Sequence, residues 1–377
     1  MSSSFISLGA ALHSFVPSAV RSHGKHKRSR SMPTSRVHPI VADFQCQLQA
    51  KLEILIQQQP QQPEPYNIST AWLGKALDVV LFIYSSLKDL HPHIMPIDSN
   101  VEGKWLSQHM EDLVNLLDVC NVLRECMSEI KKHNTSVQIA LHGLLHAHAQ
   151  MNNQVVKAKD SLDKCMDELR KNKDMESRLA KCMSTLKRMA DSLHTTTAIA
   201  ASMDGSGVEE AIKEAKAITI FVCTALVASL SFNTPCRSFM PGAGFLKTKK
   251  SISPTSLPSL MDINSMTNMM QQKLKDAMEM QRKSSSSLFR FLLHELNNVD
   301  ITIGNLNNLL ERYIMNRTSK SSSNMQDELM DSIHVVYMST IEFESALTHI
   351  DQRMNEIFKF MISSRVALLN NISALSS

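Results

Sequence analysis

The sequence predicts an all-α fold, a bundle of long amphipathic antiparallel helices that follows a disordered N-terminal arm. Composition supports this class, because only 10 of 377 residues are glycine and 5% are aromatic. Sheet proteins use both residue types at turns and on pleated faces. Periodicity supports it as well, since apolar residues recur three and four positions apart through most of the chain, as on the buried side of a helix.

The arm comprises residues 1–35, which are rich in Ser, Arg, Lys and His and contain no acidic residue. This composition is typical of a transit peptide, and a basic disordered arm is the alternative. The formal net charge of +4 arises from this end of the chain. The body therefore has no basic excess and is not expected to bind nucleic acid. We expect an intracellular protein, in the chloroplast or the cytoplasm.

An N-terminal helical region is expected over residues 36–232. Its first helix spans 40–58 and ends at the proline-rich stretch 57–65, because three prolines cannot continue a helix. The second helix follows Ser69, a plausible N-cap, and ends before Pro92.

The third helix of this region shows the clearest stripe. From Leu113 the apolar steps alternate between three and four, as in a bundle or coiled coil. The polar stretch Lys131–Asn134 predicts a break, after which helix resumes. A more charged helical stretch continues to Leu193, and residues 205–207 (Gly-Ser-Gly) indicate a further break.

Residues 217–232 contain no charged side chain. Two interpretations remain open for this segment. A buried helix at the centre of the bundle is favoured, because sixteen residues fall short of the ~20 that span a bilayer. A membrane segment is the alternative, and it makes membrane association possible.

The C-terminal part is predicted from its composition and from the spacing of its apolar residues. Residues 233–262 contain prolines, glycines and serines and predict an irregular linker. Residues 263–377 then predict a long helical hairpin packed on the N-terminal region, with helices over 289–313 and 333–368. A short polar turn between two such helices makes them antiparallel.

No catalytic signature accompanies these helices. The seven cysteines lack a Cys-x-x-Cys pair, so a reducing compartment is expected rather than a disulfide framework. His142 and His146 share a helical face, but no third ligand lies within the same two turns. We therefore expect no enzymatic activity, no metal and no cofactor.

One modification site is a candidate in the arm. The stretch from Arg28 to Pro33 reads Arg-Ser-Arg-Ser-Met-Pro, which matches the pattern that 14-3-3 proteins bind when its second serine, Ser31, is phosphorylated. A phosphoserine supplies charge and strong acceptors for an arginine cluster. Cleavage of the arm as a transit peptide would remove this site.

Three strings together resemble one family. Residues 31–39 (Ser-Met-Pro-Thr-Ser-Arg-Val-His-Pro), Lys104-Trp105 with Leu116–Asn121 (Leu-Leu-Asp-Val-Cys-Asn), and Arg365–Asn370 (Arg-Val-Ala-Leu-Leu-Asn) are similar to the opening, central and closing segments of the plant-specific BYPASS-like family. The chain departs from that pattern by an extra Thr34 and by Ala367. The resemblance implies a mostly helical plant protein of root and shoot development that limits a root-derived mobile signal. It implies no catalytic residues.

Four residues of these strings are not easily explained by packing: Trp105, Asp118, Asn121 and Arg365. An Asp and an Arg on packed helices often pair, so a structural polar cluster among these four is expected. We expect a non-enzymatic helical interaction protein, whose partners the sequence does not identify. The alternative is a membrane-associated protein anchored by residues 217–232.

Overall fold

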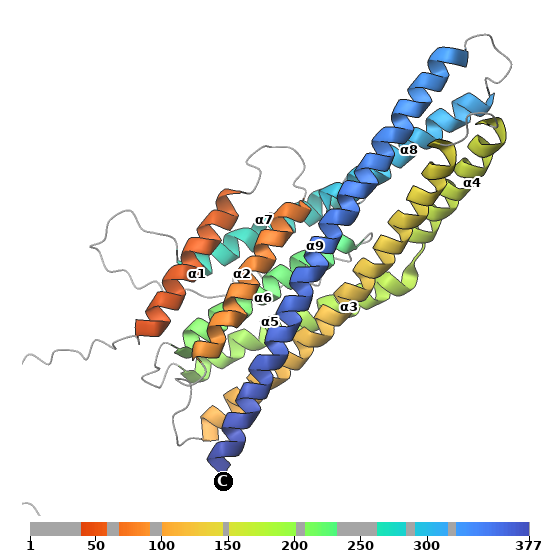
Figure 1. Ribbon diagram of the computed structural model, residues 1–377. Helices are drawn as coiled ribbons and strands as arrows, with labels where there is room; N and C mark the ends of the chain where they lie inside the picture. The colour runs from red at the N-terminus through yellow and green to blue at the C-terminus, as the bar shows by residue number, and fades with distance from the viewer. Residues whose placement is uncertain are drawn as a thin grey trace, which may run out of the picture. The chain divides into compact units, whose positions relative to one another are not determined.

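The computed structural model describes residues 39–58, 68–90, 100–145, 151–200, 208–231, 262–283, 291–315 and 322–376. Nine α-helices cover these residues, and the predicted all-α class is confirmed. They are α1 Pro39–Gln57, α2 Thr70–Leu90, α3 Asn100–Leu145, α4 Met151–Arg170, α5 Lys173–Ala200, α6 Val208–Leu230, α7 Ile263–Lys283, α8 His294–Met315 and α9 Ser322–Ser376. Residues 37–377 form one compact unit (Figure 1). The predicted N-terminal arm lies outside the described residues.

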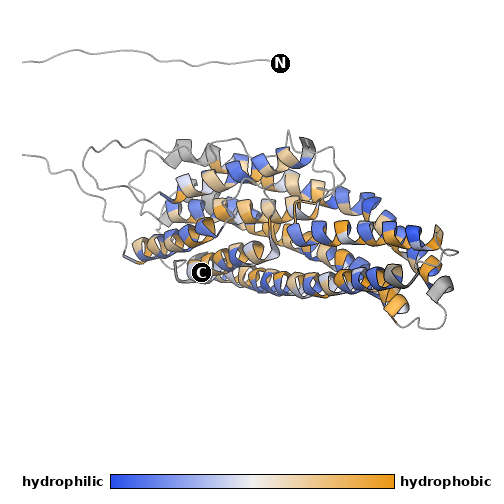
Figure 2. Ribbon diagram, turned by 90° about the horizontal axis from the view of Figure 1, so that it is seen from above, coloured by the Kyte–Doolittle hydropathy of each residue, from blue (hydrophilic) through white to orange (hydrophobic). Residues whose placement is uncertain are grey.

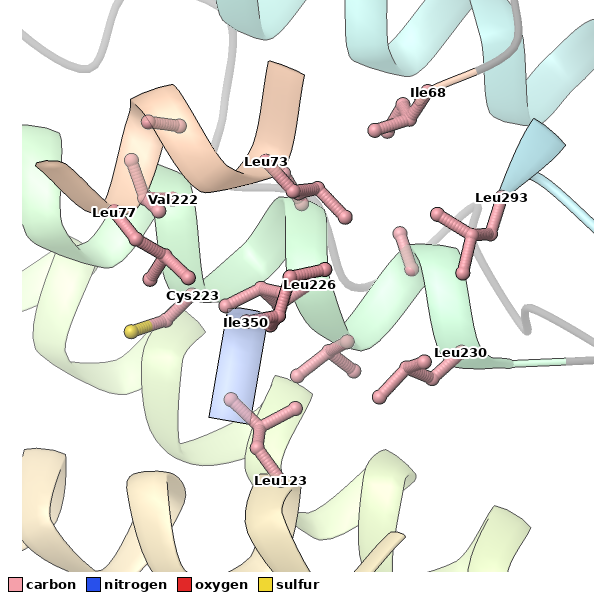
Figure 3. Close-up of a cluster of buried hydrophobic side chains, with 14 of the residues drawn as sticks. Ile68, Leu73, Leu77, Leu123, Val222, Cys223, Leu226, Leu230, Leu293 and Ile350 are labelled. Atoms are coloured by element: carbon pink, nitrogen blue, oxygen red, sulfur yellow. The ribbon is translucent and has the colours of Figure 1, made fainter. Parts of the chain in front are cut away.

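Helix α6 lies in the middle of this unit and contacts α1, α2, α3, α5 and α7. Every residue from 217 to 231 is buried, as expected of a helix that is apolar on all sides. The uncharged segment is therefore a core helix in this structure, which is the favoured sequence interpretation. Figure 3 shows side chains of three other helices gathered around it: Leu73 and Leu77 of α2, Leu123 of α3 and Ile350 of α9.

Four hydroxyl side chains are buried in this apolar helix and directly after its last residue. Each donates a hydrogen bond to the backbone carbonyl four residues earlier, at 2.7–3.0 Å: Thr219, Thr224, Ser229 and Ser231. These bonds satisfy groups that would otherwise cost free energy on burial. These four hydroxyl groups are therefore satisfied within the chain segment that carries them.

The longest helix, α9, packs against both α2 and α3 (Figure 1). It is parallel to α2, because Gly74 lies beside His349 and Asp78 pairs with Arg353 one turn further on. It is antiparallel to α3, because Asn134 bonds Thr340 whereas Arg124 pairs with Asp351. The C-terminal helix therefore joins the N-terminal helices in one core.

Helix α8 and the first half of α9 form the predicted hairpin, with Arg312 3.5 Å from Glu328 near the connection. Helix α4 packs between α3 and α8. Along these helices apolar and polar residues alternate at helical spacing, which Figure 2 shows as interleaved orange and blue.

Three local expectations need correction. The break at Lys131–Asn134 is wrong, because α3 continues through it and the buried Asn134 side chain donates to the Thr340 carbonyl at 2.8 Å. The helix expected over 289–313 begins only at His294, because residues 291–293 are not helical and Leu293 forms a parallel bridge with Ile68. Sequence reasoning also missed α7, which was assigned to the hairpin.

Two side chains cap the start of α2, one next to it in sequence and one from α8. Ser69 is the predicted N-cap, and its Oγ accepts a hydrogen bond of 3.1 Å from the Trp72 amide. The carboxylate of Glu295, in the first turn of α8, accepts bonds from the Thr70 amide at 2.9 Å and from its hydroxyl at 2.7 Å. These bonds join segments that are 225 residues apart in sequence.

Replacing Glu295 with alanine is expected to lower the free energy of unfolding by about 1–2 kcal/mol, the usual effect of losing a helix cap. Glu295→Gln keeps one acceptor oxygen and should lose less than half of that. Urea unfolding followed by circular dichroism measures both. Equal stability of wild type and Glu295→Ala would contradict a capping role.

Gly304 lies in the interior of α8, and a methyl group added there would meet nothing within 4 Å. Glycine in a helix costs about 0.5–1 kcal/mol relative to alanine. Gly304→Ala should therefore stabilise the fold by about that amount, raising the urea midpoint. A lowered midpoint would show that α8 is not a regular helix at this position.

Candidate functional site

The predicted polar cluster can be checked at three of its four residues. Asp118 and Asn121 are exposed on α3, and Arg365 is half-buried on α9. No hydrogen bond or ion pair joins these three side chains in the described part of the chain. The Trp105 side chain and Ser31 lie outside what the structure describes, so their roles stay predictions.

The most polar buried site lies elsewhere, between α3 and α6. Lys216 of α6 forms an ion pair with Asp112 of α3, and the two side chains are 10% and 2% exposed. Gln108 donates a further bond of 3.1 Å to Asp112. Two charges this deep in a protein are stable only when they neutralise each other.

Two more polar side chains border this ion pair. His109 of α3 is buried beside it. Tyr84 of α2 hydrogen-bonds Thr219 of α6, and burial raises the pKa of its phenol far above the ordinary value, with a smaller contribution from Cys223. The Tyr84 hydroxyl therefore stays protonated at every physiological pH.

The cavity at this site is very small. Its volume is about 10 Å³. Four polar residues line it: Tyr84, His109, Asp112 and Lys216. The rest of the lining is apolar and comes from α2, α3 and α6: Ile83, Leu87, Leu113, Leu116, Ile212 and Ala215. Such a space holds about one water molecule. The site has acid, base and cation side chains but no room for a substrate beside them.

Sequence reasoning missed this pair, although a signal was present. Lys216 directly precedes the uncharged segment, and a helix that is buried on all sides must neutralise any charge in its first turns. The partner could not be found in the same way, because Asp112 lies 104 residues away.

Glu214, two residues before Lys216 on α6, lies on another side of the helix and faces a different neighbour. The residue is 7% exposed, and its carboxylate accepts a bond of 3.0 Å from Gln45 of α1. The pKa of Glu214 is raised to about 7, mainly by burial and also by the negative charges of Glu210 and Asp262, while the Gln45 bond acts in the opposite direction. Glu214 is thus a buried carboxyl that ionises near neutral pH.

The buried cysteines are not activated. Burial raises the pKa of Cys126 to about 11 and that of Cys182 to about 12. A hydrogen bond with Cys120 and burial together raise the pKa of Cys223 well above its ordinary value. Since the thiolate is the reactive form, these thiols are packing groups of the core.

Ion pairs tie the helices together outside the core. Arg178 of α5 contacts Glu125 at 3.1 Å and also Glu129, both on α3. Arg170 of α4 lies 3.0 Å from Asp300 of α8, whose side chain is buried. These contacts use charged groups for assembly of the bundle rather than for a shared site.

No group of three or more His, Cys, Asp or Glu side chains in the described residues could hold a metal ion. His142 is exposed on α3, and His146 and His148 lie outside those residues. Residues 70–87 of α2 are long and apolar enough to cross a bilayer by length and composition, and 61% of that stretch is buried in the bundle. Core helices have the same composition.

Comparison with known proteins identifies the family. A family model described as Protein BPS1 matches residues 95–319, more than half of the chain. The chain belongs to the BPS1 family. This confirms the resemblance read from the sequence strings. The matched region contains α3 to α8, including both members of the Asp112–Lys216 pair.

The individual proteins that this chain resembles are distant from it in sequence. UPF0496 protein 4 of Oryza sativa subsp. indica and its namesake of subsp. japonica are each 26% identical over 165 residues, 44% of this chain and 35% of the relative. Protein BPS1, chloroplastic, of Arabidopsis thaliana is 22% identical over 201 residues, 53% of this chain and 54% of that protein. The chain thus spans between a third and about half of these relatives. No solved structure matches it.

Proposed function

We propose that this BPS1-family chain is a non-enzymatic helical interaction protein that acts in plant root and shoot development, limiting a root-derived mobile signal. The observation that carries the non-enzymatic part is the Asp112–Lys216 site. Its ionisable groups neutralise one another around a cavity of about 10 Å³. The developmental part rests on the family resemblance.

The proposal predicts that this site serves folding alone. In plants that lack the protein, the double variant Asp112→Asn/Lys216→Met should restore root and shoot growth as well as the wild type does. Tyr84→Phe, which removes only a hydroxyl group, should do the same. Circular dichroism of the purified variants must show that each remains folded.

Loss of rescue by either folded variant would contradict the proposal and favour chemistry at this site. The wild-type chain and a line that carries an empty vector set the two limits. Grafting wild-type shoots onto mutant roots tests the developmental part separately. Normal growth of those shoots would exclude control of a root-derived signal.

We also propose that residues 1–35 direct the chain to the plastid. The acid-free arm supports this, as does the name of the Arabidopsis relative, which describes that protein as chloroplastic. Mass spectrometry of the N-terminus in plant tissue tests it, since plastid import would remove the arm. A retained arm phosphorylated at Ser31 would instead support 14-3-3 binding.

A further inference from the structure

The N-terminal half of α9 exposes three neighbouring apolar side chains, which we call the α9 patch: Val335, Met338 and Ile341. They are 54%, 42% and 40% exposed. Successive members are three residues apart, so their side chains are neighbours on the helix surface. The opposite side of α9 is core, because Val336 and Phe343 are buried. Packing of this chain thus leaves the patch to solvent, and contiguous exposed apolar surface often marks an interaction site.

Negative charge surrounds the patch. Asp331 lies one turn before Val335, Glu342 lies one turn after Met338, and both acids are exposed. No ion pair or side-chain hydrogen bond involves either acid in the described part of the chain. Residues 321–352 contain six Asp or Glu and no Lys or Arg, which gives this stretch a formal charge of −6 with histidine neutral. The patch is therefore apolar with an unpaired acid at each end.

The neighbouring helices add little positive charge at this level. Residues 133–145 of α3 and residues 298–309 of α8 lie beside this part of α9 and contain no Lys or Arg. Two lysines directly precede the α3 stretch. Lys131 already pairs with Asp351, and Lys132 is exposed on α3. The surface around the patch therefore keeps its negative charge.

We propose that the α9 patch binds a basic amphipathic helix of a partner protein. A helix of this kind carries apolar residues three and four positions apart, which pack against an exposed apolar surface. Its flanking Lys or Arg side chains would lie opposite Asp331 and Glu342. Opposite charges at the edge of an interface speed association and exclude wrong partners. This inference rests on the proposed interaction function and names the class of partner.

Other occupants conflict with the charge of this surface. A second copy of the chain would contact the patch through the same residues, which brings two sets of acids together. Anionic membranes and nucleic acids attract basic segments and would be repelled here. The charge pattern thus favours a basic protein helix.

The test uses the full chain and two designed helical peptides with the same leucine row, one with Lys and the other with Glu at the flanking positions. Fluorescence anisotropy should show that the Lys peptide binds about tenfold more tightly than the Glu peptide, or better. Val335→Ser/Met338→Ser should weaken binding of the Lys peptide by about tenfold. Asp331→Asn/Glu342→Gln should weaken it by about threefold, as expected of exposed charge pairs.

Each variant has a matched control on another surface. Ile362→Ser/Val366→Ser removes two exposed apolar side chains near the C-terminal end of α9. Asp118→Asn/Asp160→Asn removes the same amount of charge from exposed positions on α3 and α4. Both controls should bind the Lys peptide as the wild type does. Circular dichroism checks that the variants fold, and the charge variant keeps the proposal testable if the apolar variant does not.

Equal binding of the two peptides, or equal losses in a patch variant and its control, would overturn the proposal. So would a Lys peptide that shows no measurable binding, or patch-dependent dimerisation in sedimentation experiments. Plant rescue by Asp112→Asn/Lys216→Met does not depend on the patch, so the two proposals fail separately.

Discussion

Asp112→Ala is expected to lower the free energy of unfolding by about 3–5 kcal/mol. The substitution leaves the Lys216 ammonium group inside the bundle, where its side chain is only 10% exposed and has lost its counter-charge. An isolated buried charge is far less stable than a neutral group of similar size. Chemical denaturation of the purified variant measures the loss.

The matched comparison is Glu168→Ala, because Glu168 pairs with Lys164 on the surface, where both side chains are mostly exposed. Its loss should be below about 1 kcal/mol. Asp112→Leu/Lys216→Met removes both buried charges and should recover most of the stability that Asp112→Ala loses. Similar losses in Asp112→Ala and Glu168→Ala would mean that the pair is accessible to water.

Glu214 should make the stability of the fold depend on pH. Its carboxyl pKa is raised to about 7 by burial, whereas in the unfolded chain a glutamate ionises near its ordinary value of about 4.3. Between these values the folded chain binds more protons than the unfolded chain, so stability falls as pH rises. The fall begins near the ordinary value and ends near pH 7.

Glu214→Gln cannot ionise and should remove this dependence. The variant should match the wild type at pH 4.5 and exceed it by about 3–4 kcal/mol at pH 8. The exposed Glu342→Gln on α9 serves as the control and should follow the wild type at both pH values. A Glu214→Gln variant with unchanged stability at pH 8 would show that this carboxylate is solvated in the native state.

Most helices of the fold can be predicted from local sequence signals, but the contacts between helices cannot. The Ser69 cap and the uncharged segment 217–232 could both be read from residues within one helix. Asn134 misled the prediction, because its amide bonds a carbonyl of α9 that is 206 residues away. A polar run in the middle of a helix is a break only when no such partner exists.

The candidate site shows the same limit. Asp118 and Arg365 were selected because packing did not explain them, whereas the buried pair of Asp112 and Lys216 was not recognised. Local sequence indicates that a charged residue at the edge of an apolar helix needs a partner, but not which residue that is. The unsatisfied Arg365 Nε is likewise visible only when the helices around it are in place.

Thiol labelling tests the central claim most directly: α6 is the core of a helical bundle that is folded in water. Cys46 on α1 is exposed, whereas Cys223 of α6 and Cys120 of α3 are buried. In aqueous buffer, N-ethylmaleimide should modify Cys46 within minutes and should modify Cys120 and Cys223 only after denaturant is added. Labelling of Cys223 as fast as Cys46 in the native chain would contradict a core position for α6.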